Sequence, residues 1–175
     1  MTKPKAVIIG ASHAGAQLAV SLRQEGWEGE IVVIGNEASL PYHHPPLSKT
    51  FLSGEKTAEA LWIRPAAFYE KNNIQFRHGE VIDLDRAGKK LTLHDGTTLM
   101  YDKLALCVGA QVRKIDLLGG TLKGVQYLRT LADAEALKAQ LSPNAKHAVI
   151  IGGGYIGLEI AAALRQQGMQ VVVLE

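Results

Sequence analysis

The apolar residues of this chain form two similar patterns, each a short apolar run followed by a glycine-containing turn and an amphipathic segment. The first, VIIGASHAGAQLAVSLRQEG, covers residues 7–26, and the second, VIIGGGYIGLEIAAALRQQG, covers residues 149–168. A further apolar run, IVVIG in one case and VVVLE in the other, follows each segment. Apolar runs of this length are typical of strands, and the spacing after each turn is that of a helix. The pattern therefore predicts the same strand–turn–helix–strand unit twice.

Between the two units, the pattern predicts a small β segment and a short helix. We expect a helix over residues 65–72, strands over residues 81–85, 90–94 and about 99–101, and a turn at Asp95 and Gly96. Residues 103–109 predict a buried strand that returns to the first sheet. The prolines at positions 41, 45 and 46 argue against a strand or helix before Leu47.

The chain divides near Ala110. Residues 1–110 form the predicted first nucleotide-binding domain, with the β segment at 81–101, and residues 111–175 begin a second one. In the second, Thr130 and Asp133 predict a capping box for a helix that runs to about Leu141 and is ended by Ser142 and Pro143. The predicted class is α/β, with two Rossmann-like doubly wound units. The second unit is truncated after two strands, so we expect an N-terminal fragment.

The glycines of the two turns predict phosphate binding. Gly10 and Gly152 allow a sharp turn after a strand, while Gly15 and Gly157 allow the helix to lie close to the sheet. The N-terminus of the helix then offers free N–H groups and a positive dipole end to a pyrophosphate. The second copy keeps a middle glycine, Gly154, whereas the first has Ser12 there.

The residue at the end of the second strand distinguishes the two copies. In the second copy this residue is Glu175, about twenty residues after the turn, where an acid accepts the ribose hydroxyls of NAD and repels the extra phosphate of NADP. In the first copy Gly35 takes this place, and Asn36 and Glu37 follow it. The sequence therefore predicts that either Asn36 or Glu37 contacts a ribose in the first site.

Composition limits the remaining function classes. The chain has 175 residues, of which 47% are hydrophobic, and a net charge of +2, so the charge gives no case for nucleic-acid binding. Its N-terminus is similar to a signal peptide, but the apolar run is too short for one. No apolar stretch has the length of a membrane span. With a single cysteine there is no disulfide framework. We expect a cytoplasmic protein without a metal site.

Several ordered segments of the chain resemble one family. These segments are GASHAG, GWEGEIVVIGNE, LPYHHPPLSKTFLSG, YDKLALCVGA, QYLRTLADAEAL and GGGYIGLEIAAAL. They are similar to the FAD-dependent, NADH-using ferredoxin reductases of the pyridine nucleotide–flavin oxidoreductases, the type that includes putidaredoxin, rubredoxin and dioxygenase-component reductases. The resemblance implies an FAD/NAD(P)-binding fold and electron transfer from NADH through FAD to a small iron–sulfur protein.

The resemblance also implies positions for both cofactors. FAD would contact the first turn, the adenosine side of the first sheet, the PPLSK segment and two later positions: Gly10, Ser12, His13, Ala14, Gly15, Asn36, Glu37, Lys49, Val81, Gly109 and Arg129. NADH would contact the second turn and the acid that follows it: Gly152, Gly154, Tyr155, Ile156, Gly157 and Glu175. The implied catalytic pair is Lys49, near flavin N5, and Glu159, which would hold the lysine in place.

Three departures from the family pattern involve four positions. His44 stands where the family often has arginine in PYxRPPLSK, which makes any contact with FAD dependent on pH. Cys107 and Val108 replace the usual Ala-Thr before Gly109, so a hydroxyl is lost near the cofactor. Ser12 in place of glycine narrows the first phosphate turn.

Two other functions remain open. A disulfide or peroxide reductase of the same superfamily needs a redox cysteine in the LPYHHPPLSK segment, which has none. The only cysteine, Cys107, is expected to be an inert core thiol. The second alternative is a non-catalytic nucleotide-binding module similar to apoptosis-inducing factor.

Overall fold

The computed structural model describes residues 3–141 and 145–175, which form two compact units. Unit 1 comprises the described residues of Met1–His43 together with Trp62–Ala110, and unit 2 comprises His44–Leu61 together with those of Gln111–Glu175. The segment His44–Leu61, which the sequence analysis counted with the first domain, therefore clusters with the later part of the chain. In the described ranges, no helix has the length and apolarity needed to cross a membrane.

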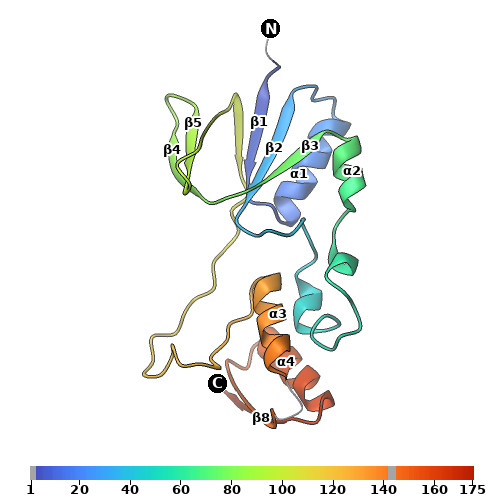
Figure 1. Ribbon diagram of the computed structural model, residues 1–175, viewed down its shortest axis with the longest axis vertical. Coiled ribbons are helices and arrows are strands. Elements are labelled where there is room, and N and C mark those ends of the chain that lie inside the picture. The colour runs from blue at the N-terminus through green and yellow to red at the C-terminus, as the bar shows by residue number, and fades with distance from the viewer. Residues whose placement is uncertain (1–2, 142–144) are drawn as a thin grey trace. The chain divides into compact units, whose positions relative to one another are not determined.

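Unit 1 is built on a parallel sheet of four strands in the order β3-β2-β1-β7 (Figure 1). The strands are β1 (Lys5–Ile9), β2 (Glu30–Gly35), β3 (Ile74–His78) and β7 (Lys103–Leu106), and the helix α1 (His13–Gln24) connects the first two. This order is the first half of a doubly wound nucleotide-binding fold. The predicted α/β class is confirmed, whereas β3 was not predicted because its sequence IQFRH is mostly polar.

The predicted return of the 103–109 segment to the first sheet is confirmed, but its burial is not. The segment forms β7 and pairs in parallel with β1, with Val7 opposite Leu104. The strand ends at Leu106, which is 63% exposed, and Cys107 is half-buried after the strand end. The expectation that Cys107 lies inside a buried strand is therefore wrong, because β7 is the edge strand of this sheet and ends before it, but Cys107 does pack against the hydrophobic core of unit 1.

The remaining elements of unit 1 follow the sequence pattern. An antiparallel sheet contains β4 (Val81–Asp85), β5 (Lys90–Leu93) and β6 (Thr98–Met100), as predicted from the alternating residues and the Asp95–Gly96 turn. The helix α2 (Ala66–Lys71) starts after Pro65, which is its N-cap. Proline is tolerated at a helix start because the first N–H groups have no partner within the helix.

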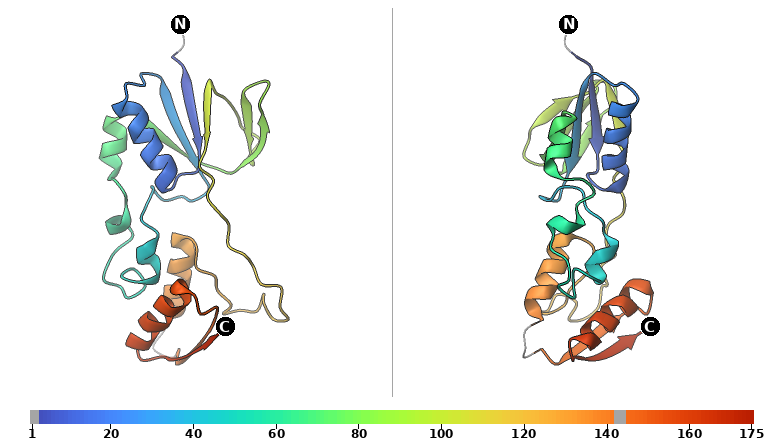
Figure 2. Two further views of the ribbon diagram at one scale, coloured as in Figure 1. Left: turned by 180° about the vertical axis from the view of Figure 1, so that it is seen from behind. Right: turned by 90° about the vertical axis from the view of Figure 1, so that its right-hand side faces the viewer.

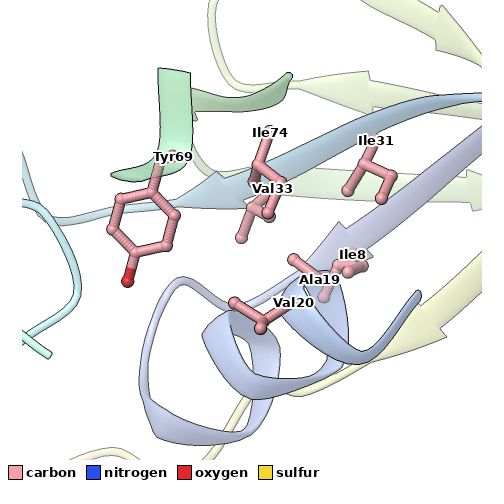
Figure 3. Close-up of a cluster of buried hydrophobic side chains, with 7 residues drawn as sticks. All are labelled: Ile8, Ala19, Val20, Ile31, Val33, Tyr69 and Ile74. Atoms are coloured by element: carbon pink, nitrogen blue, oxygen red, sulfur yellow. The ribbon is translucent and has the colours of Figure 1, made fainter. Parts of the chain in front are cut away.

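The parallel sheet of unit 1 is buried on both faces, as parallel sheets usually are. On one face, Ile8, Ile31 and Val33 pack with residues of α1, α2 and β3 (Figure 3). The alternate residues Val7, Val32 and Ile34 pack against β5 on the other face. The right view of Figure 2 shows α1 and the antiparallel sheet on opposite sides of the parallel strands.

Unit 2 contains the second strand–helix–strand unit. Its parallel strands β8 (His147–Ile151) and β9 (Gln170–Leu174) are connected by α4 (Tyr155–Gln166), and the other elements are the 3-10 helices η1 (Pro45–Ser48) and η2 (Glu59–Leu61) and the helix α3 (Leu131–Gln140). The predicted capping box of Thr130 and Asp133 is confirmed at the start of α3. Ser142 and Pro143, the predicted end of this helix, lie outside the described residues.

The start of η1 corrects the expectation that prolines exclude a helix before Leu47. The element begins at Pro45, with prolines in its first two positions. These positions do not need a backbone donor, and the fixed φ angle of proline is already helical. Lys49 follows η1 directly, so its position is set by a turn that two prolines make rigid.

Candidate functional site

The glycine turn of unit 1 is closely packed at Gly10 and at Gly15. Gly10 has a φ angle of 113°, and its N–H donates to the Ile34 carbonyl oxygen at 2.7 Å. A Cβ at Gly10 would collide with the backbone of Cys107, and a Cβ at Gly15 would collide with the carbonyl of Gly10. Only glycine therefore fits either position, and α1 starts immediately after the turn with Ser12 as its N-cap.

The turn of unit 2 repeats this geometry. Gly152 has a φ angle of 108°, and its N–H donates to the Leu174 carbonyl oxygen at 2.7 Å. A Cβ at Gly157 would collide with the Gly152 carbonyl, whereas one at Gly154 would meet open space. Each turn thus brings the N-terminus of a helix to the end of a parallel strand, the arrangement that binds pyrophosphate. Because of this arrangement, the residues of both turns fit the pyrophosphate of a dinucleotide.

The two turns differ at the position of the ribose-binding acid. In unit 1, a Cβ at Gly35 would lie 2.5 Å from the Cβ of Ala11. In unit 2 the side chains are exchanged: Gly153 corresponds to Ala11, and the Gly153 N–H donates to the Glu175 carboxylate. In unit 1, Ala11 therefore leaves no room for a side chain at Gly35, whereas in unit 2 the absence of a side chain at Gly153 leaves room for the Glu175 carboxylate. The sequence analysis missed this pairing, which the combinations Ala11–Gly35 and Gly153–Glu175 could have suggested.

The two residues predicted to contact the ribose in unit 1 have different surroundings. Glu37 accepts a hydrogen bond from the Tyr42 hydroxyl at 2.5 Å. The backbone carbonyl of Asn36 lies 3.2 Å from Nε2 of His78. Asn36 also lines a hollow of about 350 Å³, which Glu37 does not. The position next to this hollow favours Asn36 for a contact with a bound nucleotide.

This hollow lies where β2 and β3 meet the antiparallel sheet of unit 1. Its lining residues are Asn36, His78, Gly79, Glu80, Leu93, His94 and Asp95. Val81, whose backbone is predicted to meet adenine, follows Glu80 directly and pairs with Leu93. The sequence analysis missed His78 because β3 was not predicted. It placed His94 at the end of a predicted strand but assigned it no role.

The remaining predicted FAD contacts are spread over both units. Within unit 1, Nε2 of His13 lies 3.0 Å from Nδ1 of His43, while Ala14 is exposed in the first turn of α1. Partial burial, followed by the nearby His43, lowers the pKa of His13. Gly109 belongs to unit 1, whereas Arg129 belongs to unit 2, where its N–H donates to Asp133.

Tyr155 and Ile156, two of the predicted NADH contacts, open the helix α4. The Tyr155 side chain is 91% exposed and that of Ile156 is 56% exposed. Neither residue supports the packing of unit 2, so both are accessible to a ligand at the second turn.

Unit 2 brings Lys49 and Glu159 together. The Lys49 Nζ lies 2.8 Å from the Glu159 Oε1, and Ser48 donates to Oε2 of the same carboxylate at 2.6 Å. The hydrogen bond from Lys49 and then that from Ser48 lower the pKa of Glu159. The pair is partly exposed and lines a hollow of about 210 Å³ between the segment after η1 and α4. Its carboxylate is therefore ionised at neutral pH, and its ammonium can still reach a ligand.

Other chemistry is limited in the part of the chain that the structure describes. No group of three or more His, Cys, Asp or Glu residues forms a metal-binding cluster within residues 3–141 and 145–175. The single cysteine follows β7, where its N–H donates to the Ile9 carbonyl at 2.7 Å. The candidate functional residues are therefore the glycine turn of unit 1 and, in unit 2, a second glycine turn and the Lys49–Glu159 ion pair.

Comparisons with known proteins show which proteins the chain is similar to. The chain is 45% identical over 170 residues to a ferredoxin–NAD(P)(+) reductase of a Sphingomonas species, with 97% of this chain and 41% of that protein covered. It is 41% identical to putidaredoxin reductase of Pseudomonas putida, with 97% of this chain and 41% of that protein covered. The chain thus spans about two fifths of the length of these relatives.

Solved structures give the same result. The ferredoxin reductase of the CYP199A2 system from Rhodopseudomonas palustris matches with a TM-score of 0.91 at 43% identity, covering 97% of this chain and 42% of that one. A covalent putidaredoxin reductase–putidaredoxin complex matches with a TM-score of 0.90 at 38% identity, covering 100% and 43%. These matches confirm the resemblance to ferredoxin reductases. Residues 4–175 also match the pyridine nucleotide-disulphide oxidoreductase family, so the chain belongs to this family.

Proposed function

We propose that this chain carries the FAD turn and the NADH turn of a flavoprotein oxidoreductase that reduces a small iron–sulfur protein. One observation carries the proposal: two turns with the same backbone geometry differ in the residue that ends the second strand, which is Glu175 in one and Gly35 in the other. A protein with two such turns can hold two different nucleotides. Because the chain spans about two fifths of its relatives, the proposal concerns the whole protein's activity.

In this proposal unit 1 holds FAD. The tight turn at Gly10 and Gly15 directs the N-terminal amides of α1 towards the pyrophosphate. Asn36 and the hollow beside it hold the adenosine end, with the backbone at Val81 near the adenine. A bound flavin supplies the conversion between two-electron and one-electron transfer. The protein residues orient the cofactor and leave that chemistry to it.

Unit 2 holds NADH in the same proposal. Gly152, Gly154 and Gly157 form the phosphate turn, and Glu175 accepts hydrogen bonds from the adenosine ribose. The carboxylate now accepts from the Gly153 N–H, so it already lies next to the turn. A negative charge there disfavours the 2′-phosphate of NADPH, which gives the preference for NADH.

Lys49 is the proposed catalytic residue, and Glu159 holds it. In this proposal Lys49 supplies a positive charge that favours a flavin gaining electrons. Its ion pair with Glu159 holds the ammonium in one direction. The low pKa of Glu159 keeps this counter-charge present throughout the neutral range. The pair therefore orients the lysine without requiring it to exchange a proton.

The proposed electron acceptor rests on the names of the relatives alone. The relatives include reductases named for putidaredoxin and rubredoxin, and one solved relative is a covalent complex with putidaredoxin. We propose an iron–sulfur protein of this type as the electron acceptor. The cytoplasmic location stays a prediction.

The protein at its natural full length provides the test. It should be yellow, and anaerobic stopped-flow mixing should show NADH bleaching the flavin much faster than NADPH. Lys49→Met should slow bleaching about tenfold or more while FAD remains bound. Lys56→Met, in the same segment but without an ion pair described for it, is the matched control and should keep the normal rate.

The outcomes separate the open alternatives. Equal rates with NADH and NADPH would contradict the role of Glu175. Normal bleaching in Lys49→Met would remove the proposed role of Lys49. Bound FAD without reduction of any iron–sulfur acceptor would favour the non-catalytic nucleotide-binding alternative. A disulfide reductase is disfavoured because the segment at Lys49 contains no cysteine.

A further inference from the structure

Ser48 is a buried hydroxyl beside the ion pair. Its relative exposure is 5%, and it is the last residue of η1. A buried hydroxyl normally donates a hydrogen bond. Two acceptors are described near it: the Pro45 carbonyl at 3.4 Å and the Glu159 Oε2 at 2.6 Å. The shorter contact has the length of a hydrogen bond to a charged oxygen, so the proton points to Glu159.

Ser48 and Lys49 bind different oxygens of one carboxylate. Ser48 donates to Oε2 of Glu159, and Lys49 lies 2.8 Å from Oε1. A glutamate held by one oxygen rotates readily about its last side-chain torsion, which has broad minima. Two donors on the two oxygens fix the plane of the carboxylate. The position of Oε1 is then fixed, and with it the orientation of the Lys49 side chain that it binds.

The two donors, Ser48 and Lys49, lie on the same backbone turn. They are consecutive residues, and the turn that carries them is closed by the Lys49 N–H, which donates to the Pro46 carbonyl at 3.0 Å. The acceptor comes from α4, in the same unit. One rigid turn thus presents a neutral donor and a charged donor to a single acid on the neighbouring helix.

We propose that Ser48 is the positioning residue of the Lys49–Glu159 pair. Its hydroxyl holds the Glu159 carboxylate in the orientation that directs Lys49 towards its ligand. This role rests on the proposed function only for the identity of that ligand. The effect on Glu159 itself does not require a flavin, so it can be measured on the chain alone.

The test is a titration of the Glu159 carboxyl by carbon NMR in the 175-residue chain. Ser48→Ala should increase the proton affinity of Glu159 about threefold to tenfold, because one of its two donors is lost. Ser48→Thr, which keeps the hydroxyl, should restore the original midpoint. Ser53→Ala is the matched control: it removes a serine that donates to Glu55 at 2.7 Å in the same segment, and it should not move Glu159.

An unchanged Glu159 midpoint in folded Ser48→Ala would overturn the proposal, as would an equal shift in Ser48→Ala and Ser48→Thr. If Ser48→Ala fails to fold, Ser48→Cys keeps a side chain of similar size that donates only weakly, and it should raise the Glu159 midpoint above that of the unaltered chain. An unchanged midpoint in Ser48→Cys would likewise overturn the proposal.

A second measurement separates this inference from the proposed function. In the full-length protein, Ser48→Ala should slow flavin bleaching by NADH, but less than Lys49→Met. Absence of bound flavin would contradict the proposed function and leave the titration result intact. Normal bleaching in Ser48→Ala, with slow bleaching in Lys49→Met, would contradict only the positioning role of Ser48.

Discussion

The two strand–turn–helix–strand units have nearly the same backbone but very different surroundings. Val7 in β1 is fully buried, while its counterpart Val149 in β8 is 63% exposed. The first unit is part of a four-stranded sheet covered on both faces, and the second is a two-stranded sheet. The turn geometry is the same in both. Local sequence therefore sets the turn, and the surrounding elements set how much each strand contributes to stability.

Alanine at the two matched valines should give the largest difference. Val7→Ala should lower the free energy of unfolding by about 2 kcal/mol, because it leaves a cavity in a packed core. Val149→Ala in this chain should lower it by less than about 0.5 kcal/mol, because the side chain is already largely in water. Urea unfolding followed by circular dichroism measures both. Equal losses would mean that the second sheet is as well packed as the first.

The exchanged side chains at the acid position give the next test. Gly35→Ala should cost about 2 kcal/mol, because its Cβ would overlap with that of Ala11. Ala11→Gly combined with Gly35→Ala should recover most of this loss, since it recreates the arrangement of unit 2. Thermal unfolding of the single and double variants measures the coupling. Additive losses would show that the two positions do not compete for space.

The helices α1 and α4 differ at one matched polar position. Gln17 in α1 donates to Ser21 of the same helix at 3.2 Å, whereas the corresponding Glu159 binds Ser48 and Lys49. The lowered pKa of Glu159 adds stability that is present above the unfolded value of about 4.5 and is lost as pH falls through the folded value. Glu159→Gln should therefore flatten the acid side of the stability curve.

Thermal midpoints between pH 3 and 7, roughly the range in which carboxylates titrate, measure the Glu159→Gln effect. Gln17→Ala is the control in the first copy and should leave the pH dependence as it is. The same slope in Glu159→Gln and the unaltered chain would contradict the ionic role of the pair.

The smallest effect concerns His13, which Tyr155 replaces in the second copy. The pKa of His13 is below its usual value, so the folded chain favours the neutral ring. This lowered pKa adds folding stability that is fully present above the unfolded pKa of 6.5. The stability is lost as the pH falls through the lower pKa of the folded chain. His13→Gln should reduce the dependence of stability on pH in that range. His43→Gln should reduce it only in part, because burial lowers the pKa of His13 more than His43 does. Urea midpoints between about pH 5 and 8 test this.

Several elements could be predicted from the sequence because their signals are local. The strand–turn–helix units follow from glycine positions and apolar spacing, and the start of α3 follows from Thr130 and Asp133. Most strands of the antiparallel sheet follow from residue alternation around Asp95 and Gly96. By contrast, β3 was missed because its sequence is mostly polar and its burial depends on α1 and β2, which lie far from it in the sequence.

The candidate site divides in the same way. The sequence indicated both glycine turns and the types of residue around them. It did not reveal that Ser48 shares the Glu159 carboxylate with Lys49, since more than a hundred residues separate the two segments. Nor did it show that Ala11 excludes a side chain at Gly35.

The sequence by itself determined the local conformations: where the chain turns sharply, where helices begin, and which strand end carries an acid. These follow from φ angles, capping side chains and apolar spacing, all of which act over a few residues. Only the tertiary structure decided which strands are buried, which side chain fills each turn and which hydroxyl holds Glu159. These depend on contacts between distant segments, whose packing no local pattern specifies.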